Sequence, residues 1–459
     1  MQNSNENSKD RSFLGSEPIG KLLFKLALPS VIAQLINMLY NVVDRIYIGH
    51  IPGTGPLALT GLGLCMPLIL VVSAFAELVG TGGAPRASIA MGKGNYQEAE
   101  QIMGNCFTLQ IIISVILTII LSIYCEPLLL LFGASESTIG YAVDYMSIYA
   151  LGTIFVQFTL GMNLFITAQG FTTISMVTTL VGAVSNIILD PIFIYVFGMG
   201  VKGAALATII SQALSAIWII SFLFGKKTSL RLKKENLKLQ SKIIISVITL
   251  GLATFIMQST ESIISICFNA SLQKYGGDLA VGAMTICNSV MQLTMLPLYG
   301  LRQGAQPITS YNFGARNKER VKASFKLLLK TDIIYAAPIW LCVMLFPSVF
   351  AKIFTSETSL ISYTTAYLRV YMAMAGLFAI QITCQSIFTS IGYAKSSIMV
   401  ACMRKIILLI PLIYILPAII TSNKVLAVYL AEPIADLFSV IFCTILFIFQ
   451  FRKALKSLD

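Results

Sequence analysis

The chain contains two copies of one sequence pattern, separated by 222 positions (304 − 82 = 222). Gly82 and Pro85 in the first copy correspond to Gly304 and Pro307 in the second, and the correspondence runs without a gap. Glycine and proline have backbone preferences that other residues lack, so matched positions are hard to obtain by chance. Further positions, which match at the same offset, are Ser88, Gly92, Asn95, Tyr141, Tyr145 and Tyr149 with Ser310, Gly314, Asn317, Tyr363, Tyr367 and Tyr371. We therefore expect two halves with the same fold.

Apolar residues make up 56% of the chain and charged residues only 11%. Soluble domains average about 25% charged residues, so the composition excludes an ordinary soluble protein. Polar, glycine and proline breaks divide the apolar runs into about twelve segments of bilayer-spanning length, near residues 22–48, 57–80, 103–124, 138–168, 174–198, 203–224, 243–270, 279–301, 323–346, 360–390, 396–419 and 425–450. The chain is expected to be an all-α integral membrane protein that crosses the lipid bilayer of the cell (inner) membrane many times.

A polar linker at residues 225–242 divides the spans into two equal sets. Residues 18–224 are then an N-lobe and residues 243–451 a C-lobe, between polar tails at 1–17 and 452–459. An even number of spans in each lobe places both lobes the same way up, related by an axis along the membrane normal. This organisation predicts two parallel six-helix bundles that can rock against each other.

The formal net charge of +12 would also suit a nucleic-acid-binding protein. The basic residues, however, gather at the ends of alternate spans, above all in the linker, at Lys226, Lys227, Arg231, Lys233, Lys234 and Lys238. Cytoplasmic loops of membrane proteins carry an excess of Lys and Arg. We therefore interpret the charge as a topology signal that places both termini in the cytoplasm, and we expect no nucleic-acid partner.

The clearest repeated segments are rich in glycine and end the second span of each half. They are Gly80–Pro85 followed by Gly92–Asn95, and Gly300–Pro307 followed by Asn312–Asn317. Small residues let helices approach closely, and glycine commonly ends a helix. We expect these segments to pack and cap helices rather than to contact a ligand.

Polar residues inside the first span are candidates for function, since an ionisable residue there costs roughly 2.5–3.5 kcal/mol. Gln34, Asn37, Asn41 and Asp44 follow one another at helical spacing and therefore share one face. That face is expected to look into a bundle interior or a wet cavity. Arg45 follows Asp44 directly, so an interfacial salt bridge is the alternative.

The fifth span carries Asn186 and Asp190 one helical turn apart, followed by Pro191. Proline removes a backbone donor and frees the carbonyl of Ile187. A carboxylate, an amide and a loosened backbone on one face suit a proton or a small cation. The alternative is a kinked helix in which the aspartate caps a turn. The sixth span adds Thr208.

The second half does not repeat these polar residues. At the offset of 222, Asp44, Asn186 and Asp190 correspond to Ile266, Leu408 and Leu412. Its own polar candidates are Gln258, Glu261, Asn288, Gln292, Gln381 and Gln385. They could line a cavity as a cation or substrate site, or bond helix to helix. Glu432 and Asp436, one turn apart in the last span, could be structural or act in gating.

Enzymatic chemistry has little support in the sequence. His50 is the single histidine, and neither H-E-x-x-H nor a G-x-x-x-x-G-K-[ST] loop occurs. We expect no enzyme activity and no cofactor. Any pumping would then draw on an ion gradient.

The segments that identify a family are Asp44–Gly49, Gly92–Asn95, Asn186 with Asp190 and Pro191, Gly203–Thr208, and Gln306–Pro307 with Tyr311–Ala315. With them the chain, from Pro18 onward, resembles the multidrug and toxic compound extrusion (MATE) family, especially its bacterial MepA-like branch. The major facilitator superfamily also has two sets of six spans, but its loop motif needs an Asp that Arg86–Gln101 lacks.

The resemblance implies an antiporter that exports organic cations from the cytoplasm by rocker-type alternating access, driven by H⁺ or Na⁺. It implies a coupling-cation site, which would also suit Na⁺, at Asp44, Asn186, Asp190 and Thr208. Some members use a seventh-span Glu, which Glu261 matches, together with a tenth-span Asp. This chain has no acid between Glu357 and Glu432 to supply that partner.

The expected partners are small-molecule organic cations, the coupling ion and the bilayer, and we expect a monomer. Aromatic, amide and thioether side chains would form the substrate cavity, namely Gln34, Asn37, Tyr40, Asn41, Phe155, Phe158 and Met295. A lipid-linked oligosaccharide flippase of the same superfamily is the alternative, but it should need a cationic cavity, and Arg404 and Lys405 are the main deep cations. A membrane-embedded enzyme or receptor is the alternative outside transport.

Overall fold

A computed structural model describes residues 13–459 and contains only helices and their connections there. Most of the predicted polar tail at 1–17 therefore lies outside the described residues. After α2 (Phe13–Ser16), the N-lobe comprises α3 (Ile19–Gly49), α4 (Gly55–Gly92), α5 (Tyr96–Leu131), α6 (Ile139–Leu151), α7 (Thr153–Gln157), η1 (Phe158–Met162), α8 (Asn163–Ala168), α9 (Thr172–Pro191), η2 (Ile192–Val196) and α10 (Val201–Phe224).

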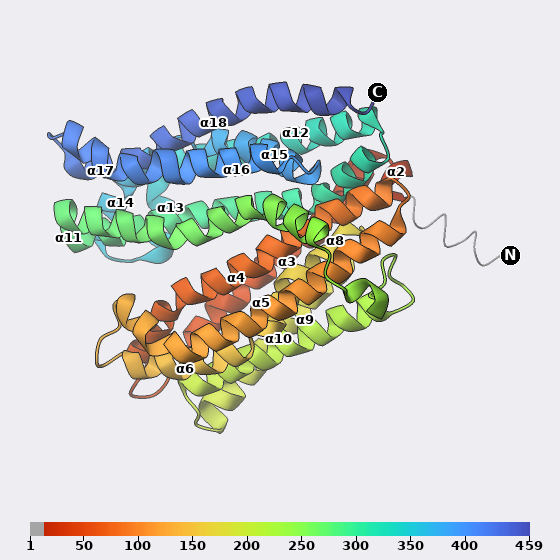
Figure 1. Ribbon diagram of the computed structural model, residues 1–459. Helices are drawn as coiled ribbons and strands as arrows, with labels where there is room; N and C mark the ends of the chain where they lie inside the picture. Colours follow the sequence, from red (N-terminus) through yellow and green to blue (C-terminus); the bar gives the residue numbers. More distant parts are fainter. Residues whose placement is uncertain (1–12) are drawn as a thin grey trace.

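The C-lobe follows a linker that holds the short helix η3 (Lys234–Leu237). It comprises α11 (Ser241–Gly314), α12 (Lys318–Leu345), α13 (Pro347–Phe354), α14 (Thr358–Tyr371), α15 (Ala375–Ser390), α16 (Ala394–Cys402), η4 (Met403–Leu409), α17 (Ile410–Ile419) and α18 (Lys424–Lys456). Figure 1 shows the two lobes as separate bundles, in warm and in cool colours.

The number of membrane spans agrees with the sequence. Within residues 13–459, eleven segments are long and apolar enough to cross a bilayer, counting each of two bent helix pairs once. One of them, α11, contains a break at Gly277, where φ is 65°. Its two parts each supply a span, which gives the twelve predicted.

The sequence repeat has a direct structural counterpart where α5 and α12 begin. The Asn95 side chain accepts a hydrogen bond from the Glu98 amide at 3.1 Å, and Asn317 accepts one from the Arg320 amide at 3.1 Å. The residue before each cap has a positive φ, 77° at Gly94 and 56° at Arg316. An N-cap of this kind contributes about 1 kcal/mol to a helix.

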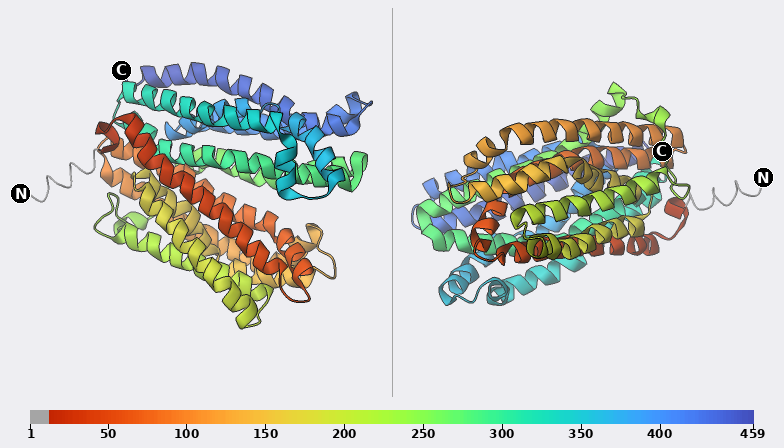
Figure 2. Two further views of the ribbon diagram at one scale, coloured as in Figure 1. Left: turned by 180° about the vertical axis from the view of Figure 1, so that it is seen from behind. Right: turned by 90° about the horizontal axis from the view of Figure 1, so that it is seen from below.

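The two lobes meet at the end of the molecule that carries the loops 93–95, 225–240 and 315–317, which we call the closed end. Toward the other end, with the loops 50–54, 132–138 and 420–423, the lobes diverge, as both side views show (Figure 1 and Figure 2). Glycines make the contact possible. A Cβ at Gly92 would strike the Tyr311 carbonyl, and one at Gly314 would strike the Ile89 carbonyl.

The repeat relates these two contacts to each other, because Ile89 and Gly92 match Tyr311 and Gly314 at the offset of 222. Gly82 lies in the same way against the Val247 carbonyl of the other lobe. Helix α4 continues through Gly80–Pro85 to Gly92, and α11 continues to Gly314. The expected helix packing is therefore confirmed, and α4 ends at Gly92, before the charged turn at Lys93, twelve residues beyond the apolar span that ends near residue 80. A helix can run on through glycine when its neighbours replace the missing side-chain contacts.

The linker is bound to the N-lobe. The Gln169 side-chain oxygen accepts hydrogen bonds from the amides of Ser229 and Leu230, both at 2.8 Å, and Lys233 pairs with Glu100 at 2.6 Å. The basic linker therefore stays with the N-lobe over most of its length. The binding continues up to the start of α11, since the Gln240 amide donates to the Asn105 side-chain oxygen at 2.6 Å.

The cap loops predict a stability difference. Gly94→Ala places a Cβ on a residue with positive φ and should lower the free energy of unfolding by about 1 kcal/mol. Gly63→Ala is the matched control, since Gly63 lies inside α4 with open space around its Cβ. Thermal unfolding in detergent should show a loss for Gly94→Ala only. An equal effect of both exchanges would contradict the cap geometry.

Candidate functional site

Two carboxyl groups face each other inside the N-lobe. Asp44, from α3, is 8% exposed, and Asp190, from α9, is 0% exposed. The two carboxyl groups act electrostatically on each other. Asn186, one turn before Asp190, donates its side-chain amide to the Asp190 Oδ1 at 3.1 Å. The spacing in the sequence thus brings three of the four predicted coupling residues together.

The pair forms no ion pair with a positive residue among the described ones, although Arg45 acts electrostatically on Asp44. Arg45 follows Asp44, but its guanidinium points toward the Met66 sulfur at 3.8 Å and forms no ion pair. The interfacial salt bridge considered from the sequence is therefore not present. Two carboxyl groups this close repel each other unless a proton or another cation lies between them.

Three oxygens of this cluster have no hydrogen-bond partner: Asp44 Oδ1, Asp190 Oδ2 and Asn186 Oδ1. Buried polar atoms are nearly always satisfied, so unpartnered ones indicate a missing ligand or proton. Carboxylate and amide oxygens are ligands for hard cations. The donor set therefore fits H⁺ or a small cation such as Na⁺.

Two further predicted residues lie near the pair without completing it. Thr208, from α10, has Tyr145 as its side-chain partner. Tyr40 interacts electrostatically with both carboxyl groups and bonds the Asn41 side chain. Tyr40 therefore belongs to the surroundings of the site, whereas the expected contact of Thr208 with the carboxyl groups is not seen in this structure.

The other polar residues of the first span separate along the helix. Asn41 donates to the Asn37 carbonyl of its own helix at 2.6 Å. Gln34, nearer the closed end, donates to Gln303 of the other lobe at 3.2 Å. The predicted polar face is therefore present, but Gln34, at its end nearer the closed end, bonds the two lobes to each other.

Two residues expected to line a substrate cavity are packed inside their lobes instead. Phe158 is 5% exposed and stacks on Phe107 with ring centres 4.8 Å apart. Met295 is 5% exposed within the core of the C-lobe. Phe155 is partly buried beside Phe158 in the same apolar cluster. In a chain this apolar, hydrophobic character alone does not distinguish cavity wall from core.

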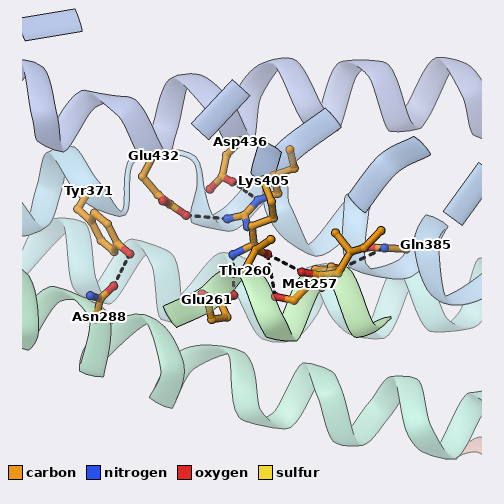
Figure 3. A network of polar contacts seen from close by, with 11 residues as sticks. Met257, Thr260, Glu261, Asn288, Tyr371, Gln385, Lys405, Glu432 and Asp436 are labelled. Atoms are coloured by element: carbon orange, nitrogen blue, oxygen red, sulfur yellow. Dashed lines mark hydrogen bonds and ion pairs between the residues drawn. The ribbon is translucent and has the colours of Figure 1, made fainter. Parts of the chain in front are cut away.

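The C-lobe holds a second cluster of charged residues, shown in Figure 3. The Arg404 guanidinium pairs with Glu432 at 2.6 Å and with Asp436 at 2.7 Å, and all three residues are at most 5% exposed. The guanidinium also lies 4.3 Å from the centre of the Phe378 ring. Glu432 and Asp436, whose role the sequence left open, are thus the counterions of one buried arginine.

Lys405, the next residue, pairs with Glu261 of α11 at 2.6 Å. Both cations come from η4, a π-helical turn between α16 and α17. The Lys405 side chain is 4% exposed and that of Glu261 is 55% exposed. Of the two roles that the sequence left open for Glu261, a cation or substrate site and a bond between helices, this structure shows the second, with the Lys405 ammonium as its partner.

The predicted amides of the C-lobe do not converge on one place. Asn288 accepts a hydrogen bond from the Tyr371 hydroxyl at 2.6 Å, and Gln385 donates to the Met257 sulfur at 3.2 Å. Gln258 bonds Glu77 of the N-lobe. The remaining two differ in burial, because Gln381 is buried and unpartnered and Gln292 is exposed. Asn288, Gln385 and Gln258 therefore bond one helix to another, and the five residues form no joint site in this structure.

The model of the MatE family matches residues 29–192 and 253–415, once in each lobe. The chain belongs to the MatE family. The expected family resemblance is therefore confirmed, and with it a membrane-spanning secondary transporter rather than an enzyme.

Similar proteins include the "Multidrug export protein MepA" of Staphylococcus haemolyticus (strain JCSC1435), 25% identical over 398 residues, or 87% of each chain. The protein of the same name from Staphylococcus saprophyticus is 23% identical and covers 91% of this chain and 92% of its own.

Two solved structures show the same fold. "Crystal structure of MATE in the bent conformation" has a TM-score of 0.91 at 23% identity and covers 98% of this chain and 99% of that one. An outward-facing MATE family transporter of the MOP superfamily has a TM-score of 0.88 at 23% identity, over 98% of both chains.

The buried C-lobe cluster predicts a large stability effect. Arg404→Met leaves Glu432 and Asp436 without a counterion and should cost about 3–5 kcal/mol of folding free energy, as breaking buried ion pairs does. The exposed Arg452→Met is the matched control. Thermal unfolding in detergent measures both. Adding Glu432→Gln and Asp436→Asn should restore part of the loss; no restoration would contradict the pairing.

Proposed function

We propose that the chain exports organic cations from the cytoplasm in exchange for H⁺ or Na⁺. The observation that carries the proposal is the buried pair Asp44 and Asp190, with three unpartnered oxygens and no ion pair with a positive residue among residues 13–459. The relatives bear the name of multidrug export proteins, which supports the same class of substrate. Each chain contains both lobes, so the unit of transport is a monomer.

The organic cation and the coupling ion compete for the carboxyl groups of Asp44 and Asp190. When ionised, the carboxylates attract an organic cation or Na⁺ into a region where a charge is costly. When protonated, they have no charge to offer, and the bound cation leaves. Two ligands that compete for the same carboxylates have linked binding free energies, so a gradient of one drives the other.

The lobe arrangement supports alternating access. The lobes meet at the closed end through backbone contacts at glycines and diverge at the other end. The basic linker lies at the closed end, and the excess of Lys and Arg there supports a cytoplasmic location for this end. The structure then corresponds to a state closed to the cytoplasm. Rocking of the lobes would separate the glycine contacts and open that side.

A flippase for a phosphate-bearing lipid fits the structure less well. Such a substrate needs free positive charge in the lobes. The two deep cations, Arg404 and Lys405, are each paired with carboxylates at 2.6–2.7 Å. The cluster of three acids and two cations has a net negative charge, which would repel a phosphate.

Asp44→Asn and Asp190→Asn remove the exchangeable charge while keeping the shape of each side chain. In proteoliposomes with an H⁺ or an Na⁺ gradient imposed separately, each variant should lower gradient-driven efflux of a cationic dye about tenfold or more, within the range of linked binding sites. The wild type should respond to one of the two gradients.

Asp144→Asn is the matched control, since Asp144 is an exposed acid paired with the exposed Lys202 at 3.3 Å. It should transport at the wild-type rate. Wild-type efflux in both Asp44→Asn and Asp190→Asn, with all proteins folded, would exclude the pair as the coupling site.

A further inference from the structure

A third buried acid lies apart from both charged clusters. Asp332, in the middle of α12, is 0% exposed. Its Oδ2 lies 2.6 Å from the Thr383 hydroxyl of α15, which is also 0% exposed. Its Oδ1 has no hydrogen-bond partner. A carboxylate with one bond and no counterion would be poorly stabilised there.

The hydrogen-bond geometry fits a protonated Asp332. The Thr383 oxygen lies 2.9 Å from the Ala379 carbonyl as well as 2.6 Å from Asp332. A hydroxyl has one proton and can donate it to one acceptor at a time. If the Thr383 hydroxyl donates its proton to the Ala379 carbonyl of its own helix, then the contact between Thr383 and Asp332 needs a proton from Asp332. The protonated acid then donates to the hydroxyl, and the hydroxyl donates to the carbonyl, so both contacts are hydrogen bonds.

The charged surroundings leave one group that can balance an ionised Asp332. Helix α15 contains no Asp, Glu, Lys or Arg. Lys25 of α3 pairs with Glu17, and Lys330 of α12 itself is exposed. Arg302 of α11 acts electrostatically on Asp332. Within residues 13–459, no Lys or Arg forms an ion pair with Asp332.

Arg302 also connects Asp332 to the other lobe. Its guanidinium lies 5.4 Å from the centre of the Tyr299 ring and acts electrostatically on Glu77 of the N-lobe. Glu77 in turn bonds Gln258 of the C-lobe. One arginine therefore acts electrostatically on an acid of each lobe, although it forms an ion pair with neither.

The repeat shows that packing alone does not require an acid here. At the offset of 222, Asp332 and Thr383 match Gln110 and Gly161. Gln110 is 0% exposed, and its amide fills the space that a Cβ on Gly161 would need. A neutral amide thus serves the same position in the N-lobe. The carboxyl group is particular to the C-lobe, as Asp44 and Asp190 are particular to the N-lobe.

We propose that Asp332 is a second proton-binding site, which exchanges its proton during transport, with Arg302 as its counterion once the proton has left. The carboxylic acid gives up a proton to water that reaches it when the lobes rearrange, and a carboxylate remains. Arg302 then turns toward Asp332, and its electrostatic attraction to Glu77 across the lobes weakens. The inference rests on the proposed ion-coupled export.

Infrared spectroscopy tests the site without transport. In purified Asp44→Asn/Asp190→Asn protein, a carboxylic-acid C=O band should be present, should disappear as the pH is raised, and should be lost on adding Asp332→Asn. Thr383→Val keeps the acid but removes its acceptor, so the band should move to the frequency of an acid without a hydrogen bond. Absence of the band, or a band that does not respond to pH, would overturn the proposal.

Transport tests the use of the site. Asp332→Asn mimics the protonated acid, because its amide can donate to Thr383 in the same way. It should keep dye binding but lower gradient-driven efflux about tenfold, within the usual range of coupling between sites. Efflux at the rate of the control Asp144→Asn would overturn the role in coupling. Failure of the proposed export would appear differently, as wild-type protein that no gradient drives, and the infrared result would still decide protonation.

Discussion

The membrane interior offers no water to an ionised side chain, so every buried charge needs a partner from the protein or a bound ion. One cluster of the C-lobe meets this constraint with its own residues, since Arg404 and Lys405 face Glu432, Asp436 and Glu261. Asp44 and Asp190 of the N-lobe form no ion pair, and three oxygens of their cluster with Asn186 have no hydrogen-bond partner. Under the proposed function, this pair is therefore the place where a cation from outside binds.

The contact between the two lobes is made at glycine residues. Gly92 and Gly314 bring helix backbones of the two lobes together at one end, through a pair of contacts that the repeat relates. These contacts are made by backbone atoms. Among the polar contacts across the lobes, the one between Gln34 and Gln303 is 3.2 Å long. No ion pair within residues 13–459 joins the two lobes, so the lobes can separate without breaking one.

The repeat, the spans and the shared face of Asn186 and Asp190 were predictable from sequence, because helical spacing determines which residues share a face, whereas the pairing of Asp44 with Asp190 followed from the family resemblance. Asn186 and Asp190 are one turn apart whatever surrounds them. The pairing of Glu261 with Lys405 was not predictable, since the residues are far apart in the chain and meet through a π-helical turn. Phe158 and Met295 were misplaced because apolar residues occur on every face of these helices. The extent of α4 beyond Gly80 depends on contacts with the other lobe, which local sequence does not reveal.

The central claim is that a cationic substrate and the coupling ion compete for Asp44 and Asp190. Binding of a permanently charged dye to the purified protein should therefore release a cation. Proton release is measured with a pH indicator in weakly buffered solution, and sodium release with protein preloaded with radioactive Na⁺. The account predicts release of one of the two ions by wild-type protein and none by Asp44→Asn/Asp190→Asn protein. Dye binding without release of either ion would contradict it.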